Sequence, residues 1–171
     1  MARRVFFSFH YQADIWRVSQ VRNSWLMQNG ESNRFMDAAA WEKVKRKGEA
    51  SITAWIDEQL NGTSVTVVLI GGETASRRYV RYEIEESYER GNGLLGIYIN
   101  RIRDREGYIS AKGPNPLARV RVEVEAEWWD IFGSTRREPL TKIFETYDWV
   151  KDDGRQNMGQ WIEKAARHAG R

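Results

Sequence analysis

Two short segments of the chain bring together side chains that could do chemistry. Ser8–Asp14 (SFHYQAD) carries a hydroxyl, aromatic rings, an imidazole and a carboxylate. Gly71–Thr74 (GGET) joins two residues without side chains, which let a ligand approach the backbone, to a carboxylate and a hydroxyl. Neither segment has the GxGxxG spacing of a dinucleotide-binding turn or the GxxxxGKS/T spacing of a phosphate loop. Each is a candidate ligand-binding turn, and the alternative is an ordinary strand-to-helix turn.

Some of these polar residues also have structural explanations. A histidine at a strand end, such as His10, is more often a hydrogen-bonded structural residue than a catalytic one. Asp14 stands where the N-cap of the following helix is expected. Asp152 and Asp153, within YDWVKDDGRQN, indicate a turn before a helix rather than a metal site.

The residue composition excludes several kinds of site. The chain has no cysteine, which rules out a disulfide framework, a thiolate nucleophile, a zinc ribbon and an iron–sulfur cluster. Its two histidines, His10 and His168, are too few for a histidine-rich metal site. We therefore predict no metal.

Glu83 lies on a predicted helix over residues 77–90. Opposite charges four residues apart place most charged residues of this helix on a solvated face. Glu83 differs because it follows Val80 by three residues and precedes Ser87 by four, on the flank of the apolar stripe. The spacing allows a half-buried carboxylate at the ligand edge of a sheet, whereas the alternative is an exposed helix glutamate.

The elements that position these residues alternate between strands and helices. Nearly continuous apolar runs predict strands at Val5–Phe9, Thr63–Ile70 and Leu94–Asn100. Between and after them, amphipathic spacing predicts helices with these residues inward: Ile15, Val18 and Val21; Ile52, Trp55, Ile56 and Leu60; Val80, Ile84 and Ser87 or Tyr88; and Trp161, Ile162 and Ala165 after an Asn157 cap. Continuous strands separated by helices predict a parallel sheet covered on both faces.

The remaining segments are less regular. Ser24–Gln28 either ends the first helix or forms a short strand, and Asn29–Gly48 is predicted as a loop with at most one helical turn. Arg101–Leu117 is predicted as a loop. Arg119–Glu127 alternates strictly between apolar and charged residues, which predicts a half-exposed strand or edge hairpin. Lys142–Trp149 is a candidate last strand.

The fold class that follows is α/β, with a single domain over residues 1–171. It is a three-layer parallel sheet of flavodoxin-like type with helices on both faces, a β insertion late in the chain and a terminal helix over about 157–169. In such sheets, ligands bind at the carboxyl ends of the strands, where both candidate turns and Glu83 are expected.

Length and charge narrow the functional class. The 171 residues are 41% hydrophobic, and 27 basic against 24 acidic residues leave a net charge of +3. This surplus is too small to predict nucleic-acid binding. No apolar run approaches the ~18–20 residues of a membrane span, and the N-terminus lacks a signal sequence. We expect a soluble, cytoplasmic protein without a membrane partner.

Three stretches together carry a family resemblance. The chain resembles the bacterial TIR-like family whose members act as sensors in the Thoeris anti-phage system, strongly over the core at residues 4–100 and again near 146–170. The stretches are RVFFSFHYQADIWRVSQVRNSW, GEASITAWIDEQLNGTSVTVVLIGGETASRRYVRYEIEES and TYDWVKDDGRQNMGQWIEKAA. In the family, an aromatic residue and Val or Cys precede the catalytic glutamate. Tyr79-Val80 maps that glutamate to Glu83, with Tyr79 where Trp is commoner. The insertion at about 101–145 matches poorly, and no role is carried over to it.

The resemblance implies cleavage of NAD at the nicotinamide–ribose bond, with NAD as substrate and no cofactor. Nicotinamide leaves a cationic pyridinium as a neutral molecule, so no general acid is needed, unlike in O-glycoside hydrolysis. An ionised Glu83 would hold the ribose hydroxyls and stabilise the developing positive charge. Phe9, His10 and Tyr11 would pack on or orient the nicotinamide riboside half. The other residues expected to bind substrate are Ser8, Asp14, Gly71, Gly72, Thr74 and Tyr79.

The implied product is a cyclic ADP-ribose-type second messenger that activates a partner effector. A phage-derived trigger and a homo-oligomer are the other implied partners. One alternative is a catalytically silent TIR-like module that works by protein–protein assembly. A receiver domain is disfavoured, because Ile70 leads into Gly71-Gly72 where the phosphorylated aspartate would stand.

Overall fold

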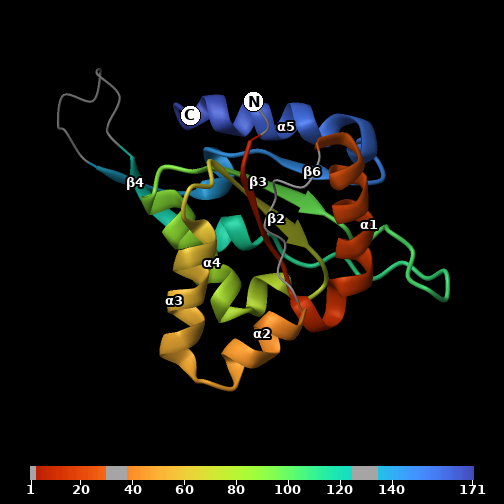
Figure 1. Ribbon diagram of the computed structural model, residues 1–171. Helices are drawn as coiled ribbons and strands as arrows, with labels where there is room; N and C mark the ends of the chain where they lie inside the picture. The colour runs from red at the N-terminus through yellow and green to blue at the C-terminus, as the bar shows by residue number, and fades with distance from the viewer. Residues whose placement is uncertain (1–2, 30–37, 125–134) are drawn as a thin grey trace.

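One parallel sheet organises the protein. The computed structural model describes residues 3–29, 38–124 and 135–171. Its main sheet contains four strands: β1 (Val5–Ser8), β2 (Val65–Ile70), β3 (Gly93–Tyr98) and β6 (Thr146–Asp148). They lie side by side in the order β1-β2-β3-β6, and every neighbouring pair is parallel (Figure 1). The flavodoxin-like α/β class predicted from the alternating runs is confirmed.

Helices cover both faces of this sheet. On one face, α1 (Tyr11–Asn29) and α5 (Gly154–His168) bury residues such as Val18 and Ile162 against β1, β2 and β3. On the other face lie α2 (Ala38–Lys45), α3 (Glu49–Leu60) and α4 (Arg78–Glu89), as Figure 1 shows. In the described part of the chain, no helix is long and apolar enough to cross a membrane.

The alternation of β1 divides its side chains between the two faces. Phe7 packs in the cluster beneath α1 and α5, whereas Phe6 packs against α3. All six residues of β2 are buried because it is a central strand with helices on both sides. Fully burying a Leu or Ile side chain contributes about 1.5–3 kcal/mol, so β2 is a major source of stability.

The start of α1 differs from the prediction. The helix begins at Tyr11, so Asp14 lies in its first turn and is not its N-cap. Ile15, predicted to point inward, is 39% exposed, because Asp14, Val18 and Val21 occupy the buried face instead. Ser24–Gln28 belongs to the same helix, which settles the alternative of a short strand.

Two other helix predictions need correction. The segment predicted as a loop with at most one helical turn contains the eight-residue α2, whose Trp41 and Val44 pack against α3. The remainder of that loop, residues 30–37, lies outside the described residues. The terminal helix begins at Gly154 rather than after Asn157. A Cβ on residue 154 would overlap the Trp149 ring, which explains the glycine there.

The late β insertion is a separate hairpin. β4 (Arg121–Val124) and β5 (Arg136–Pro139) pair antiparallel in a two-stranded sheet, with Arg121 opposite Pro139. The edge hairpin predicted from alternation is therefore confirmed over residues 121–124, while the predicted continuation to Glu127 lies outside the described residues. Short 3₁₀ turns at Pro116–Arg119 and Leu140–Lys142 flank the hairpin. The predicted last strand exists as β6, shorter than Lys142–Trp149.

Candidate functional site

The carboxyl ends of β1 and β2 lie together because the two strands are parallel, with Ser8 in register with Val68. Ser8 is the last residue of β1, and Gly71 follows β2 directly. Chain segments leaving these ends carry both candidate turns of the sequence. The site is therefore built from the β1–α1 turn, the β2–α4 turn and the inward face of α4.

Glu83 is one of two deeply buried acidic groups in this region. It lies on the inward face of α4 with Val80, Ile84 and Ser87, and it is 2% exposed. The Ser8 hydroxyl donates a hydrogen bond to Glu83 Oε2. Burial raises the pKa of Glu83 to about 8, and the hydrogen bond from Ser8 opposes that rise. At pH 7 the carboxyl of the free protein is therefore mainly protonated.

Asp14 is a second buried carboxyl, 2% exposed and held against the β2–α4 turn. A Cβ on residue 71 would overlap its carboxylate, so only glycine leaves room there. The Thr74 hydroxyl accepts a hydrogen bond from the Gly71 amide at 2.8 Å and also hydrogen-bonds the Asp14 carboxyl. Burial raises the pKa of Asp14 to about 6, opposed by the charge of Arg17. Among the described residues, none hydrogen-bonds to Asp14 Oδ2.

His10 lies in the β1–α1 turn, between Ser8 and Asp14 in sequence, and faces the β2–α4 turn. It is buried, and its Nδ1 lies 3.9 Å from Glu73 Oε2 and has no hydrogen-bond partner in the part of the chain that the structure describes. Burial lowers the pKa of His10, and the charge of Arg77 lowers it further, while Glu73 acts in the opposite direction. The imidazole is therefore neutral at pH 7. The sequence left open that His10 is a structural residue held by a hydrogen bond. Its Nδ1 makes no such bond to the described residues.

Three predicted binding residues have other neighbours. Phe9 packs in the apolar cluster beneath α1 and α5, with the Tyr11 ring centroid 6.1 Å away. Tyr79 packs edge-on against Trp41 of α2, at 5.9 Å between ring centroids. Its hydroxyl accepts a hydrogen bond from Arg78. Their roles in substrate binding remain predictions.

The loop after β3 covers the β2–α4 turn, which the sequence did not predict. A Cβ on Gly113 would overlap the carbonyl groups of Gly71 and Gly72, so this loop packs directly on them. In the same segment Asn100 is buried and Ser110 is half-buried, and neither Asn100 Oδ1 nor Ser110 Oγ has a hydrogen-bond partner among the described residues. The glycine before Pro114 was the available signal for this close approach.

The acidic pair near α5 is structural. Asp152 Oδ2 accepts a hydrogen bond from the Asp148 amide at 2.6 Å, and Asp153 adopts a left-handed φ of 49° before the helix. The predicted turn is confirmed. Within residues 3–29, 38–124 and 135–171, no group of three or more His, Cys, Asp or Glu side chains could hold a metal ion.

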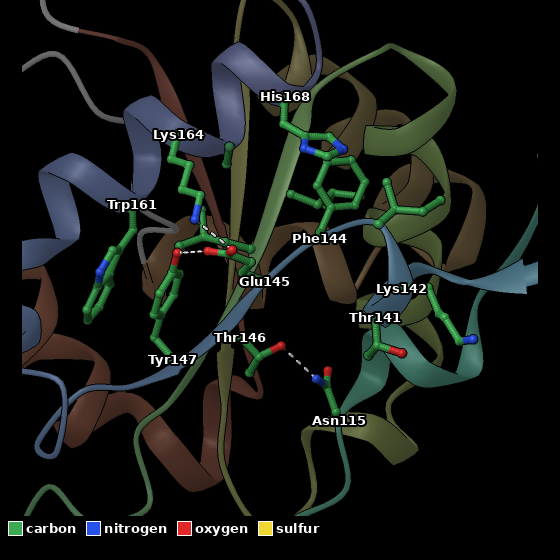
Figure 2. A pocket seen from close by; sticks show the side chains of 14 residues that line it. Asn115, Thr141, Lys142, Phe144, Glu145, Thr146, Tyr147, Trp161, Lys164 and His168 are labelled. Carbon is green, nitrogen blue, oxygen red and sulfur yellow. Dashed lines mark hydrogen bonds and ion pairs between the residues drawn. The ribbon is translucent and has the colours of Figure 1, made fainter.

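A cavity of about 590 Å³ lies at the other end of the sheet (Figure 2). It is lined at the starts of β3 and β6 and along the last turns of α5. Lys164 and Tyr147 both donate to Glu145, and Asn115 donates to Thr146 at 2.9 Å, as Figure 2 shows. Glu145, the acidic residue that lines the cavity, is thus already hydrogen-bonded to neighbouring side chains. The lining of the cavity includes neither Ser8 nor Glu83.

The chemistry available at the carboxyl end follows from these contacts. Ser8 donates to a carboxyl and not to an imidazole, so the arrangement lacks the serine–histidine contact of nucleophilic hydrolases. A buried carboxyl next to a hydroxyl can instead stabilise a positive charge that develops beside it, because the low local dielectric strengthens that attraction.

Comparison with known proteins adds two findings. The family described as "Thoeris protein ThsB, TIR-like domain" matches residues 6–104. A protein of Bacillus cereus (strain MSX-D12), named "Putative cyclic ADP-D-ribose synthase ThsB1", is 38% identical over 191 aligned residues. The alignment covers 95% of this chain and 100% of that protein.

Proposed function

Because the chain belongs to the Thoeris ThsB family of TIR-like domains, we propose that it cleaves NAD and makes a cyclic ADP-ribose-type second messenger. In this proposal the messenger activates a partner effector in cytoplasmic defence against phage. The observation that carries it is the buried Glu83 carboxyl, which accepts a hydrogen bond from Ser8 at the carboxyl end of the sheet.

Glu83 acts on the ribose next to the nicotinamide. The bond from ribose C1′ to the nicotinamide nitrogen breaks, and its electron pair leaves with neutral nicotinamide. The carboxylate stabilises the positive charge that forms on the ribose, and Ser8 holds the carboxylate in place. A nucleophilic atom elsewhere in the same ADP-ribose then bonds to C1′, and one proton is released. Exclusion of water from the site that encloses the bound substrate would favour this internal capture over hydrolysis.

The protonation of Glu83 is coupled to substrate binding. Its pKa of about 8 leaves the carboxyl mainly neutral at pH 7, yet catalysis requires the ionised form. The positive charge of the bound nicotinamide ring favours ionisation, so NAD lowers the pKa of the group that it needs. The neutral His10 adds no competing positive charge at this pH, whereas Asp14, with a pKa of about 6, is mainly ionised.

Access to Glu83 is the step on which activation would act. A side chain that is 2% exposed cannot contact a dinucleotide until its neighbours move. We expect low basal turnover and a rise when a phage-derived trigger or self-association opens the carboxyl end of the sheet.

The test is NAD turnover by the purified protein with mass analysis of the products, for the parent and Glu83→Gln. Lysate from phage-infected cells that express each form is assayed in parallel. Glu83→Gln keeps the size and can still accept from Ser8 but removes the charge, so turnover should fall at least about 100-fold. The variant should melt no lower than the parent at pH 8, because it removes a carboxylate that is costly to bury.

Two outcomes would count against the proposal. Equal turnover by the parent and the variant would show that Glu83 is not the catalytic group. No ADP-ribose-derived product in either sample would favour the assembly module, which size-exclusion chromatography with infected lysate would then detect as a shift in mass.

A further inference from the structure

The cavity of about 590 Å³ at the starts of β3 and β6 lies apart from the candidate site (Figure 2). We call it the amino-end cavity. Its wall consists of the starts of both strands, residues 141–145 and the later turns of α5, together with Asn115. Apart from Leu94 and Leu95, the lining lies after residue 104, where the match to the family ends. That match therefore does not account for the cavity.

The amino-end cavity has the size of a site for one small molecule. Such sites usually enclose about 300–1,000 Å³, and 590 Å³ lies within this range. Two of its walls are fixed by direct contact between backbones. A Cβ on residue 93, at the start of β3, would overlap the carbonyl group of Ala165 in α5, so only glycine lets the strand and the helix approach so closely. The space between them is therefore part of the folded structure.

Aromatic rings contribute to the wall from the segment after the hairpin and from α5. Tyr147 stacks on Trp161, with ring centroids 4.2 Å apart and 3° between the ring planes. Phe144 packs against His168 at 5.6 Å between ring centroids. Phe144 and Trp161 are buried, whereas Tyr147 is half-buried and keeps part of its ring accessible. Such a wall favours a flat aromatic ligand, because ring-to-ring contacts add to the gain from burying apolar surface.

The charged residues of the lining favour one negative charge on the ligand. The lining contains two lysines, Lys142 and Lys164, and a single acidic residue, Glu145. With the histidine counted as neutral, this leaves a surplus of one positive charge. Hydrogen bonds from Lys164 and Tyr147 lower the pKa of Glu145, so its carboxyl is ionised at pH 7. A second negative charge on the ligand would therefore be repelled by Glu145.

Lys164 is the group placed to bind the negative charge. It extends from α5 toward Glu145 and the start of β6, as Figure 2 shows. Its ammonium has three N–H donors, and among the described residues it hydrogen-bonds only to Glu145, at 2.6 Å. Its side chain is 59% exposed. The other donors can therefore reach a ligand carboxylate while the contact with Glu145 stays in place.

We propose that the amino-end cavity binds a small, planar aromatic carboxylate, whose ring packs against Phe144 and Tyr147 and whose carboxylate accepts hydrogen bonds from Lys164. Lys142 adds to the positive potential, since its Nζ is 3.9 Å from Glu138 and 68% of its side chain is exposed. This inference is independent of the proposed function, because no residue of the lining belongs to the turns around Ser8 and Glu83.

The first test uses 2-naphthoate as the probe, with its uncharged analogue 2-naphthamide for comparison. Titration of the ¹⁵N-labelled full chain, followed by NMR, gives both the affinity and the position of the ligand. We expect 2-naphthoate to shift the amide signals of Leu95, Thr146 and Ala165 and to leave those of Ser8 and Gly71 unchanged. The amide analogue should bind about tenfold more weakly, because it lacks the charge-assisted hydrogen bond. Absence of shifts at the amino-end cavity would overturn the proposal.

Variants of the lining then test the role of charge. Lys164→Met should weaken 2-naphthoate binding about tenfold and leave 2-naphthamide binding nearly unchanged. Glu145→Gln should strengthen 2-naphthoate binding, because it removes the repelling carboxylate. Lys151→Met is the matched control, since Lys151 is an exposed lysine outside the lining. Equal binding by the parent and Lys164→Met would refute the proposal.

A further variant separates this inference from the proposed function. Glu83→Gln should bind 2-naphthoate as the parent does, whether or not the parent cleaves NAD. A loss of 2-naphthoate binding in Glu83→Gln would place the probe at the carboxyl ends of the strands and overturn the proposal. Unchanged binding by Glu83→Gln, together with weaker binding by Lys164→Met, would support it even if no NAD turnover is found.

Discussion

Two sets of buried polar side chains, one at each end of the sheet, differ in their hydrogen bonding. At the amino ends of β2 and β3, Asn92 Nδ2 donates to Thr63 Oγ1 at 2.8 Å, and Thr63 Oγ1 donates to the Leu60 carbonyl at 2.7 Å. At the carboxyl ends, the described part of the chain offers no hydrogen-bond partner to His10 Nδ1, Asp14 Oδ2 or Asn100 Oδ1. Both sets are buried to a similar degree.

The difference has an energetic meaning. A buried polar atom without a partner costs about 1–3 kcal/mol, so the carboxyl end lowers the stability of the protein. Such a cost persists where the unpaired groups serve binding or catalysis. The Asn92–Thr63 pair contributes stability, whereas the unpaired groups at the carboxyl ends keep hydrogen-bonding capacity that a ligand could use.

The pH dependence of turnover should give the largest effect at the carboxyl end. In the proposed mechanism Glu83 must be ionised to act, and its pKa of about 8 in the free protein lies above the ordinary 4.5. The ionised fraction therefore rises about tenfold per pH unit below pH 8, so kcat/KM should rise on the order of 50-fold to 100-fold from pH 6 to pH 8 and then level off. Steady-state assays across this range measure it.

Ser8→Ala sharpens the same measurement. Removing the donor to Glu83 takes away the contact that lowers its pKa, so the rise in kcat/KM should shift to higher pH. A profile that is flat from pH 6 to 8, or that falls, would contradict the role given to a buried carboxyl.

Gly71→Ala should give the second largest effect, on stability and turnover together. The new Cβ would overlap the Asp14 carboxylate, which is buried and cannot move into solvent without disturbing α1. Overpacking of this kind costs about 1–3 kcal/mol. Gly72→Ala is the control, because its nearest neighbour would be the Ala111 carbonyl oxygen at 3.5 Å. Equal thermal unfolding of the two variants would refute the close contact.

A matched pair of asparagines should give the smallest effect. Asn92→Ala removes a 2.8 Å hydrogen bond at the amino end and should lower the free energy of unfolding by about 1–2 kcal/mol. Asn100→Ala removes only a 3.5 Å contact to the Ser110 carbonyl and should cost about 1 kcal/mol less. Urea unfolding of both variants tests the comparison, and an equal loss would remove the distinction between the two ends.

Local patterns predicted the elements of the main sheet better than their ends. The central strand needed only its run of β-branched and aliphatic residues, since burial on both faces requires that composition. The position of Asp14 was wrong because the helix starts directly after the short turn at Phe9-His10, and capping preferences do not reveal how soon a chain turns. For α2, the overlooked signal was the high helix propensity of Ala38–Ala40.

The candidate site depended on different information. Spacing placed Glu83 only on the flank of an apolar stripe, and the family resemblance singled it out. Its full burial and its contact with Ser8 are tertiary facts that no helical pattern contains. Arg119 and Gly113 lie in a segment without periodicity and contact the β2–α4 turn from more than thirty residues away in sequence.

The first and last described residues of the chain are neighbours. Arg3 Nη2 donates to the Arg171 carbonyl at 3.2 Å and its Nε pairs with Glu163 at 2.8 Å, so both ends lie beside α5 (Figure 1). A short linker could therefore join them in a circular permutant, with new ends opened at the exposed turn around Lys47 between α2 and α3. Such a rearranged chain keeps every strand of the main sheet. It removes the covalent link between α2 and α3, so that only their packing would hold these two helices together.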